Sequence, residues 1–168
     1  MTIDALERFC SQSGNMQMLQ FSVNDAEPLF ALIDSNREHL SQFGDNASAK
    51  YPTPTSVFQS IVAPRHPKRL RFGIWLEGVL AGSINLTPDS PTAASVGYWV
   101  GRQYTRRGIA SGALQAMMQY ATAEKGYKTL TADTHKDNFV SQRVLYRAGF
   151  RIDRAQGDAF RWTWEAPG

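Results

Sequence analysis

The chain has 168 residues and a formal net charge of +3, with 42% hydrophobic and 20% charged residues, which excludes global disorder and favours one domain with its own core. Its single cysteine, Cys10, excludes an intrachain disulfide framework and a cysteine-rich zinc site, and it fits a reducing cytoplasm. The sequence contains neither a signal peptide nor an apolar run of membrane-spanning length, so we expect a cytoplasmic protein.

We expect a single domain over residues 1–168, in which residues 1–15 form a loosely held leader. The run MQMLQF at 16–21 is typical of a strand. Asn24 or Asp25 can then cap a helix. Apolar residues recur along that helix with a helical period, at Ala26, Leu29, Phe30, Ile33 and Leu40.

Residues 43–55 are predicted as a long polar turn region. A second helix is expected from Thr55, with apolar positions at Val57, Phe58, Ile61 and Val62. A basic, proline-punctuated loop, APRHPKRLRF, leads into residues 71–88, where two runs rich in strand-forming residues flank Glu77-Gly78. A dipeptide of this kind between two strands indicates a hairpin.

The second half of the chain alternates between strands and helices. The predicted elements are a strand at 95–101, a helix with Ile109, Leu114, Met117, Met118 and Ala121 on its buried side that ends near Gly126, a strand at 128–135, a helix at 139–148 that ends at Gly149, and strands at 150–153 and 159–165 around a Gly157-Asp158 turn. The full order is strand, two helices, three strands, helix, strand, helix and two strands. It predicts an α/β or α+β fold with a mixed sheet.

The segment YTRRGIASGAL at 104–114 places a glycine between a basic pair and a predicted helix. A helix start offers free backbone N–H groups and the positive end of the helix dipole, which together favour an anion. The glycine would let the backbone approach a phosphate closely. The candidate anion-binding residues are Arg106, Arg107, Gly108, Ile109, Ala110 and Ser111. The alternative interpretation is a surface loop with two solvated arginines.

Two other phosphate-binding motifs are missing from the sequence. It contains no GxxxxGK(S/T) and no GxGxxG after an N-terminal strand. A P-loop nucleotide hydrolase and a dinucleotide-binding fold are therefore not supported.

Residues 137–150 read DNFVSQRVLYRAGF and follow TRRGIA at 105–110, with one predicted strand between them. The two stretches resemble, in order, the Gln/Arg-x-x-Gly-x-Gly/Ala motif and the Asn-x-x-Ser/Ala pattern of the GNAT superfamily of acyl-CoA-dependent N-acyltransferases. The second pattern is matched by Asn138, Ser141, Tyr146, Gly149 and Phe150. Thr105 departs from the first motif, which usually has Gln or Arg at that position.

The GYW at 97–99 and the NREHL at 36–40 are most similar to the ribosomal-protein N-acetyltransferase (Rim-type) branch of that superfamily. The resemblance spans roughly residues 16–165. It implies a mostly antiparallel, twisted sheet flanked by helices, in which a parallel pair of central strands splays apart to form an acyl-CoA cleft.

The resemblance also implies roles for individual residues. Acetyl-CoA would lie between the strands at 95–101 and 128–135, with its pyrophosphate on residues 107–111. The residues implied to contact its pantetheine are Tyr98, Trp99, Val100, Asn138 and Ser141. Tyr146 matches the family position of the general acid that protonates the leaving thiolate. No metal is implied.

Each of these residues also has a structural interpretation. Tyr146 could pack against the core with its hydroxyl at the surface, and Asn138 could cap the short helix. Ser141 could simply occupy the first turn of that helix, and Trp99 is of a type more often found in a core. No general base is identifiable: Asp133, His135 and Asp137 lie at the end of the strand beside the cofactor, and Glu77 falls in the predicted hairpin turn.

The expected activity is transfer of an acetyl group from acetyl-CoA to a primary amine, by a monomer or a homodimer. The acceptor is either a protein N-terminus or a small amine, and no membrane or nucleic-acid partner is expected. The alternative is a non-catalytic domain of the same fold that binds or senses CoA. An RNA-binding module is disfavoured because the chain lacks paired strand aromatics and a GXXG clamp.

Overall fold

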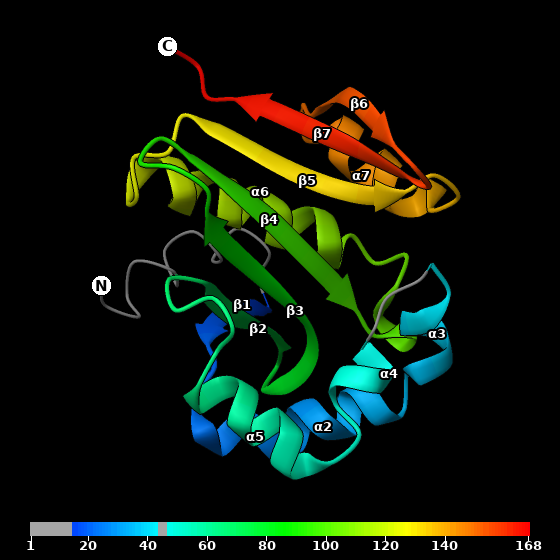
Figure 1. The fold of residues 1–168 in the computed structure, drawn as a ribbon. Helices are drawn as coiled ribbons and strands as arrows, with labels where there is room; N and C mark the ends of the chain where they lie inside the picture. The colour runs from blue at the N-terminus through cyan, green and yellow to red at the C-terminus, as the bar shows by residue number, and fades with distance from the viewer. Residues whose placement is uncertain (1–14, 44–46) are drawn as a thin grey trace.

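A computed structural model describes residues 15–43 and 47–168 of the chain. The predicted leader, with Cys10, lies outside these residues apart from Asn15. The elements, labelled as in Figure 1, are β1 (Met16–Gln20), the 3-10 helix η2 (Val23–Asp25), α2 (Ala26–Asp34), α3 (Arg37–Ser41), α4 (Ala47–Lys50), α5 (Pro54–Val62), β2 (Leu70–Leu76), β3 (Val79–Pro88), β4 (Ala93–Val100), the 3-10 helix η3 (Arg102–Tyr104), α6 (Ile109–Ala123), β5 (Thr129–His135), α7 (Phe139–Arg147), β6 (Arg151–Gln156) and β7 (Ala159–Glu165).

The strands and the helices α6 and α7 follow the predicted order, and a short 3-10 helix, η3, lies between β4 and α6. The single helix predicted through Leu40 is instead divided into α2, which ends at Asp34, and α3, which carries Leu40. The stretch 43–55 is not all turn, because Ala47–Lys50 form helix α4; alanine and lysine are strong helix formers. Asp25 does not cap α2 with its side chain. Its Oδ2 instead accepts the backbone N–H of Ser22 at 2.8 Å, one turn earlier. Helix α5 begins at Pro54, where Thr53 accepts the N–H of Ser56 at 3.1 Å.

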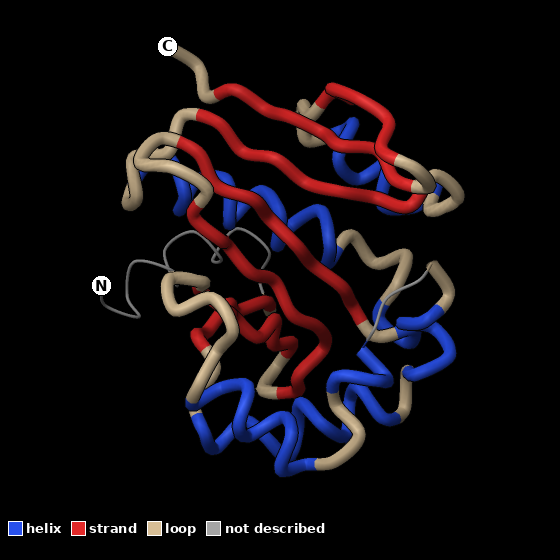
Figure 2. The backbone as a smooth tube through the Cα atoms, in the orientation of Figure 1, coloured by secondary structure: helices blue, strands red, loops and turns tan. Residues whose placement is uncertain are grey.

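The strands form one seven-stranded sheet in the order β1-β2-β3-β4-β5-β7-β6, whose path is clear in Figure 2. Neighbouring strands are antiparallel, with the exception of the parallel pair β4–β5. The predicted hairpin joins β2 to β3. Glu77 and Gly78 have φ angles of 48° and 82°, as the favoured type I′ turn requires. The predicted mixed, mostly antiparallel sheet is confirmed.

Two hydrophobic clusters pack on the two faces of the sheet. The larger cluster joins α6 and α7 to strands β1 to β5 and β7, and the smaller one joins α2, α3 and α5 to the other face of β2, β3 and β4. Figure 1 shows α6 crossing behind β4 and β5. Small side chains on its buried side, Ala113, Ala116 and Ala121, let the helix axis lie close to the strands.

Gly82 is a point where β3 and β4 have no room for a side chain. A Cβ there would collide with the Trp99 carbonyl oxygen and stand 3.0 Å from the Cα of Val100. Because both atoms belong to the backbone of β4, they cannot yield without moving the strand.

We predict that Gly82→Ala destabilises the protein by about 1–3 kcal/mol, the usual cost of overpacking. Gly78→Ala is the matched control: it has open space around its Cβ and pays only for its left-handed backbone, about 1 kcal/mol. The free energy of unfolding of both variants is measured by urea denaturation. A cost for Gly82→Ala no larger than that of the control would contradict the close approach of the two strands.

Candidate functional site

The parallel strands β4 and β5 pair over only three residues each. The ladder joins Ala93 to Thr129, Ala94 to Leu130 and Ser95 to Thr131. Beyond that point β4 stays paired with β3, and β5 stays paired with β7, to the ends of both strands. Figure 2 shows the two central strands moving apart toward their C-terminal ends. The expected splayed pair is present.

The direction of the backbone groups in β4 follows from its hydrogen bonds. Gly101 donates its N–H to Ala81 of β3 at 2.8 Å, and Ala93 accepts the N–H of Asp89 at 2.9 Å. Because strand residues alternate, the odd-numbered residues of β4 point their polar backbone groups toward β3. The even-numbered residues, Tyr98 and Val100, therefore point theirs toward β5 and the opening, whereas those of Trp99 face β3.

The predicted anion-binding segment forms the start of α6. Gly108 is the N-cap with φ 73°, and Arg106 before it also has a positive φ, 63°. The first helical hydrogen bond runs from the Gly112 N–H to the Gly108 carbonyl. The N–H groups of residues 109–111 consequently precede the helical ladder, as at any helix start.

The surroundings of this helix start are open. A Cβ at Gly108 would meet no atom within 4 Å, and Arg106 and Arg107 are exposed beside it. Ile109 is buried in the core, so only its backbone can face a ligand. Thr105, the residue that departs from the family motif, donates its hydroxyl to the Arg102 carbonyl at 2.7 Å. Its side chain therefore stabilises the local turn.

Tyr98 and Ser141 are brought together between β4 and α7. The Tyr98 hydroxyl lies 3.0 Å from Ser141 Oγ and 3.4 Å from the Ser141 carbonyl oxygen. Burial raises the pKa of Tyr98 to about 12, although the hydrogen bond with Ser141 acts in the opposite direction. Asn138 caps α7, because its Oδ1 accepts the Ser141 N–H at 3.2 Å. The capping interpretation of Asn138 is therefore confirmed, and it fixes the helix turn that carries Ser141.

Tyr146 does not join this group. Its side chain is 58% exposed, and the guanidinium carbon of Arg151 lies 4.4 Å from the centre of its ring. The preceding residue, Leu145, is fully buried and lies one helical turn beyond Ser141. The inward face of α7 carries Leu145, and the predicted role of Tyr146, which rests on the family motif, stays a prediction.

Two residues that were not proposed as site residues lie at the open end of the splayed strands. His39 of α3 places Nε2 at 3.2 Å from the Val100 carbonyl oxygen. Phe43, just after α3, stacks its ring at 5.8 Å from the ring of His135, the last residue of β5. Asn36 adds a third tie, since its buried side chain accepts the Arg102 N–H at 2.8 Å. Asn36 and His39 belong to the NREHL motif, but the sequence alone does not show that they contact Arg102 and Val100, which lie 66 and 61 residues further along the chain.

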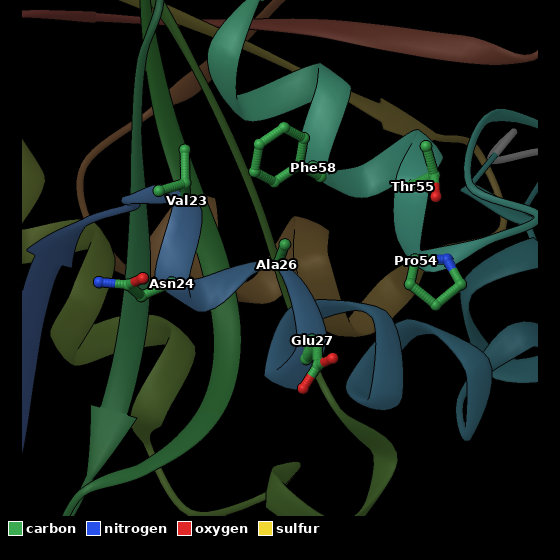
Figure 3. A pocket seen from close by; sticks show the side chains of 7 residues that line it. All are labelled: Val23, Asn24, Ala26, Glu27, Pro54, Thr55 and Phe58. Atoms are coloured by element: carbon green, nitrogen blue, oxygen red, sulfur yellow. The ribbon is translucent and has the colours of Figure 1, made fainter.

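A hollow in the surface lies elsewhere, between the start of α2 and α5. It has a volume of about 480 Å³ and is lined by Val23, Asn24, Ala26, Glu27, Pro54, Thr55 and Phe58, which Figure 3 shows from close by. None of the predicted cofactor-binding residues lines it.

Across residues 15–43 and 47–168, no group of three or more His, Cys, Asp or Glu side chains is arranged to hold a metal ion. In the same part of the chain, no helix is long and apolar enough to cross a membrane.

Comparisons with known proteins place this arrangement in a family. A family model described as an acetyltransferase (GNAT) domain matches residues 16–151. The chain is 25% identical over 146 residues to the ribosomal-protein-serine acetyltransferase of Escherichia coli (strain K12), covering 84% of this chain and 82% of that protein. It is 23% identical over 152 residues to the putative ribosomal N-acetyltransferase YdaF of Bacillus subtilis (strain 168), covering 84% of this chain and 80% of that protein.

Solved structures show the same fold. RimL, a ribosomal L7/L12 alpha-N-protein acetyltransferase in complex with coenzyme A, superposes with a TM-score of 0.81 at 19% identity, covering 90% of this chain and 94% of that one. The microcin C7 self-immunity acetyltransferase MccE, in complex with acetyl-CoA and AMP, superposes with a TM-score of 0.75 at 20% identity, covering 91% of this chain and 93% of that one. The family model extends from β1 to the start of β6, through every element of the candidate site. The chain belongs to the acetyltransferase (GNAT) family and is an acetyltransferase that takes its acetyl group from acetyl-CoA.

Proposed function

We propose that the protein acetylates the N-terminal amine of a protein, with acetyl-CoA bound in the opening between β4 and β5. The observation that carries the proposal is the end of the β4–β5 ladder at Ser95–Thr131, beside the open helix start at Gly108. The names of the curated relatives, which act on ribosomal proteins, support a protein acceptor. A small-molecule amine is the second candidate, supported by the likeness to a microcin self-immunity acetyltransferase.

In this proposal acetyl-CoA is held mainly by backbone groups of the protein. The N–H and C=O groups of Tyr98 and Val100 pair with the extended pantetheine as a further strand would. The same N–H groups polarise the thioester carbonyl, which gains negative charge when the amine attacks. Trp99 contributes through its position in the strand, since its own polar backbone groups face β3. The helix start at 107–111, with Arg106, receives the pyrophosphate.

The leaving thiolate needs a proton, and two hydroxyl groups compete for that role. The family position points to Tyr146, whereas the geometry favours the Tyr98–Ser141 pair, because it lies between β4 and α7 with its hydroxyls in contact. Burial raises the pKa of the Tyr98 phenol to about 12, so at neutral pH the phenol carries the proton that the thiolate needs, as a weaker acid than an ordinary tyrosine. Asn138 positions Ser141 by accepting its backbone N–H at 3.2 Å.

The single cysteine supports action in a reducing cytoplasm, which we propose as the location. The small net charge supports neither a membrane nor a nucleic-acid partner. We propose one domain over the whole chain, as a monomer or a homodimer.

The acceptor is tested with isotopically labelled acetyl-CoA and mass spectrometry. We expect label on a short peptide with a free N-terminal serine and none on the same peptide with a blocked N-terminus. Label on spermidine but not on the peptide would favour the small-molecule acceptor. Binding of acetyl-CoA without transfer to any amine would leave the alternative, a CoA-binding domain without catalysis.

The anion-binding role of the helix start is tested by a pair of glycines on α6. Gly108 and Gly126 flank the helix with φ angles of 73° and 74°, and a Cβ at either would meet no atom within 4 Å. Gly108→Ala and Gly126→Ala should therefore lose similar stability, about 1 kcal/mol each. Only Gly108→Ala should weaken acetyl-CoA binding, by about tenfold (~1.4 kcal/mol), in a calorimetric titration. Equal affinities for the two variants would exclude this helix start as the pyrophosphate site.

The proton donor is tested with Tyr98→Phe and Tyr146→Phe at saturating acetyl-CoA. We expect Tyr98→Phe to lower turnover by on the order of 100-fold, the lower range for a general acid, and to lower it more than Tyr146→Phe does. The thermal shift produced by acetyl-CoA reports whether each variant still binds the donor. A loss confined to Tyr146→Phe would assign the acid to the family position instead.

A further inference from the structure

The acceptor side of the opening carries an imidazole whose orientation is fixed by the backbone. His39 Nε2 lies 3.2 Å from the Val100 carbonyl oxygen. A carbonyl oxygen can only accept a hydrogen bond, so Nε2 carries the hydrogen. In the neutral ring the other nitrogen, Nδ1, is then the unprotonated one. No hydrogen-bond partner of Nδ1 is found in the part of the chain that the structure describes.

This imidazole sits on the face of the sheet opposite α6. Leu40, next to His39 in α3, packs in the smaller cluster with Trp99, whereas Tyr98 and Val100 pack in the larger cluster with α6. The Val100 carbonyl faces the opening between β4 and β5. His39 thus stands at the edge of the opening, away from the helix start that would hold the pyrophosphate.

The segment from His39 to Phe43 also spans the open end. His39 contacts the last residue of β4, and Phe43 contacts His135, the last residue of β5. An amine that reaches the thioester from this face passes beside α3 and the residues that follow it.

Two other titratable groups near the opening have acceptor atoms engaged. Both carboxylate oxygens of Asp133 accept from Arg161, at 2.9 and 3.0 Å. His135 Nδ1 accepts the backbone N–H of Asp137 at 3.1 Å, so in the neutral ring its Nε2 is a donor and not a base. Glu77 lies in the β2–β3 turn, and Asp137 is exposed with Oδ2 at 3.8 Å from His135 Nδ1. Among the described residues, His39 is the imidazole beside the opening that keeps one ring nitrogen without a hydrogen-bond partner.

We propose that His39 is the general base, and this inference rests on the proposed acetyl transfer. Nδ1 takes a proton from the acceptor's ammonium group, directly or through one water, as the amine nitrogen attacks the thioester carbon. The C–N bond forms, the newly bonded nitrogen loses its second proton to water, the C–S bond breaks, and the thiolate takes a proton from the hydroxyl pair on the other side of the strands. The Val100 carbonyl holds the imidazole in the required tautomer, as a backbone acceptor does for other catalytic histidines.

The charged groups on the surrounding elements do not pair with this ring. Arg37 binds Asp34 and the Tyr51 carbonyl, Glu38 is exposed on the same helix, and Arg102 is exposed beyond β4.

The simpler role of His39 is to tie α3 to β4, and His39→Gln separates the two roles. The glutamine amide can still donate to the Val100 carbonyl, but it has no basic nitrogen. With the N-terminal-serine peptide as acceptor, we expect His39→Gln to lower turnover by on the order of 100-fold, and His39→Ala by at least as much. The acetyl-CoA thermal shift and the unfolding midpoint of His39→Gln should stay close to those of the unchanged protein.

The pH profile gives a readout that a structural tie would not move. In the unchanged protein, kcat/KM for the peptide should rise with pH as an imidazole loses its proton, and this limb should be missing in His39→Gln. His66→Gln, in the basic loop far from the opening, is the matched control and should keep both the rate and the limb. Turnover of His39→Gln within a few fold of the unchanged protein, or an unaltered pH limb, would overturn the proposal. If the unchanged protein itself acetylates no amine, the proposed function fails instead.

Discussion

The rest of the site depends on one constraint, the early end of the parallel ladder between β4 and β5. The two strands pair only as far as Ser95 and Thr131, yet each continues with a full antiparallel partner on its other side. The strands therefore cannot close up by sliding, since β3 and β7 fix their registers. α6 packs behind the sheet in the larger hydrophobic cluster. The opening is a property of the whole sheet.

An opening in a sheet exposes backbone groups that the sheet would otherwise satisfy. The polar groups of Tyr98 and Val100 face it, and such groups need a partner because an unpaired one costs free energy when water is excluded. In this structure the Val100 carbonyl is met by His39, and a carbonyl oxygen has a second lone pair for another donor. The same carbonyl can thus hold the imidazole and still pair with an extended ligand. The Val100 carbonyl oxygen would therefore connect His39, on the side from which the amine is proposed to enter, to the strand β4 that is proposed to bind acetyl-CoA.

Much of this arrangement was predictable from the sequence where the signal is local. Gly108 before a periodic apolar helix, and Glu77-Gly78 between two strand-like runs, each determine a backbone turn by themselves, and both appear with the positive φ angles that such turns need. The role of Tyr146 came from the family motif and stays a prediction; the structure shows its side chain exposed on α7 and not packed in the core. His39 and Val100 are 61 residues apart, and no local pattern encodes that contact.

The separation of the sheet faces also bears on how protons would move during the reaction. On the proposed mechanism, His39 removes one proton on the α3 face, and the Tyr98–Ser141 pair delivers one on the face of α6 and α7. The two groups therefore do not exchange a proton directly, and each must be reset through solvent after product leaves. His39 is only half-buried and can do so readily, whereas Tyr98 is held in the larger cluster and reaches outward through Ser141. Ser141 would then act as a relay as well as a hydrogen-bond partner, and the cap from Asn138 would keep its hydroxyl in line with the phenol.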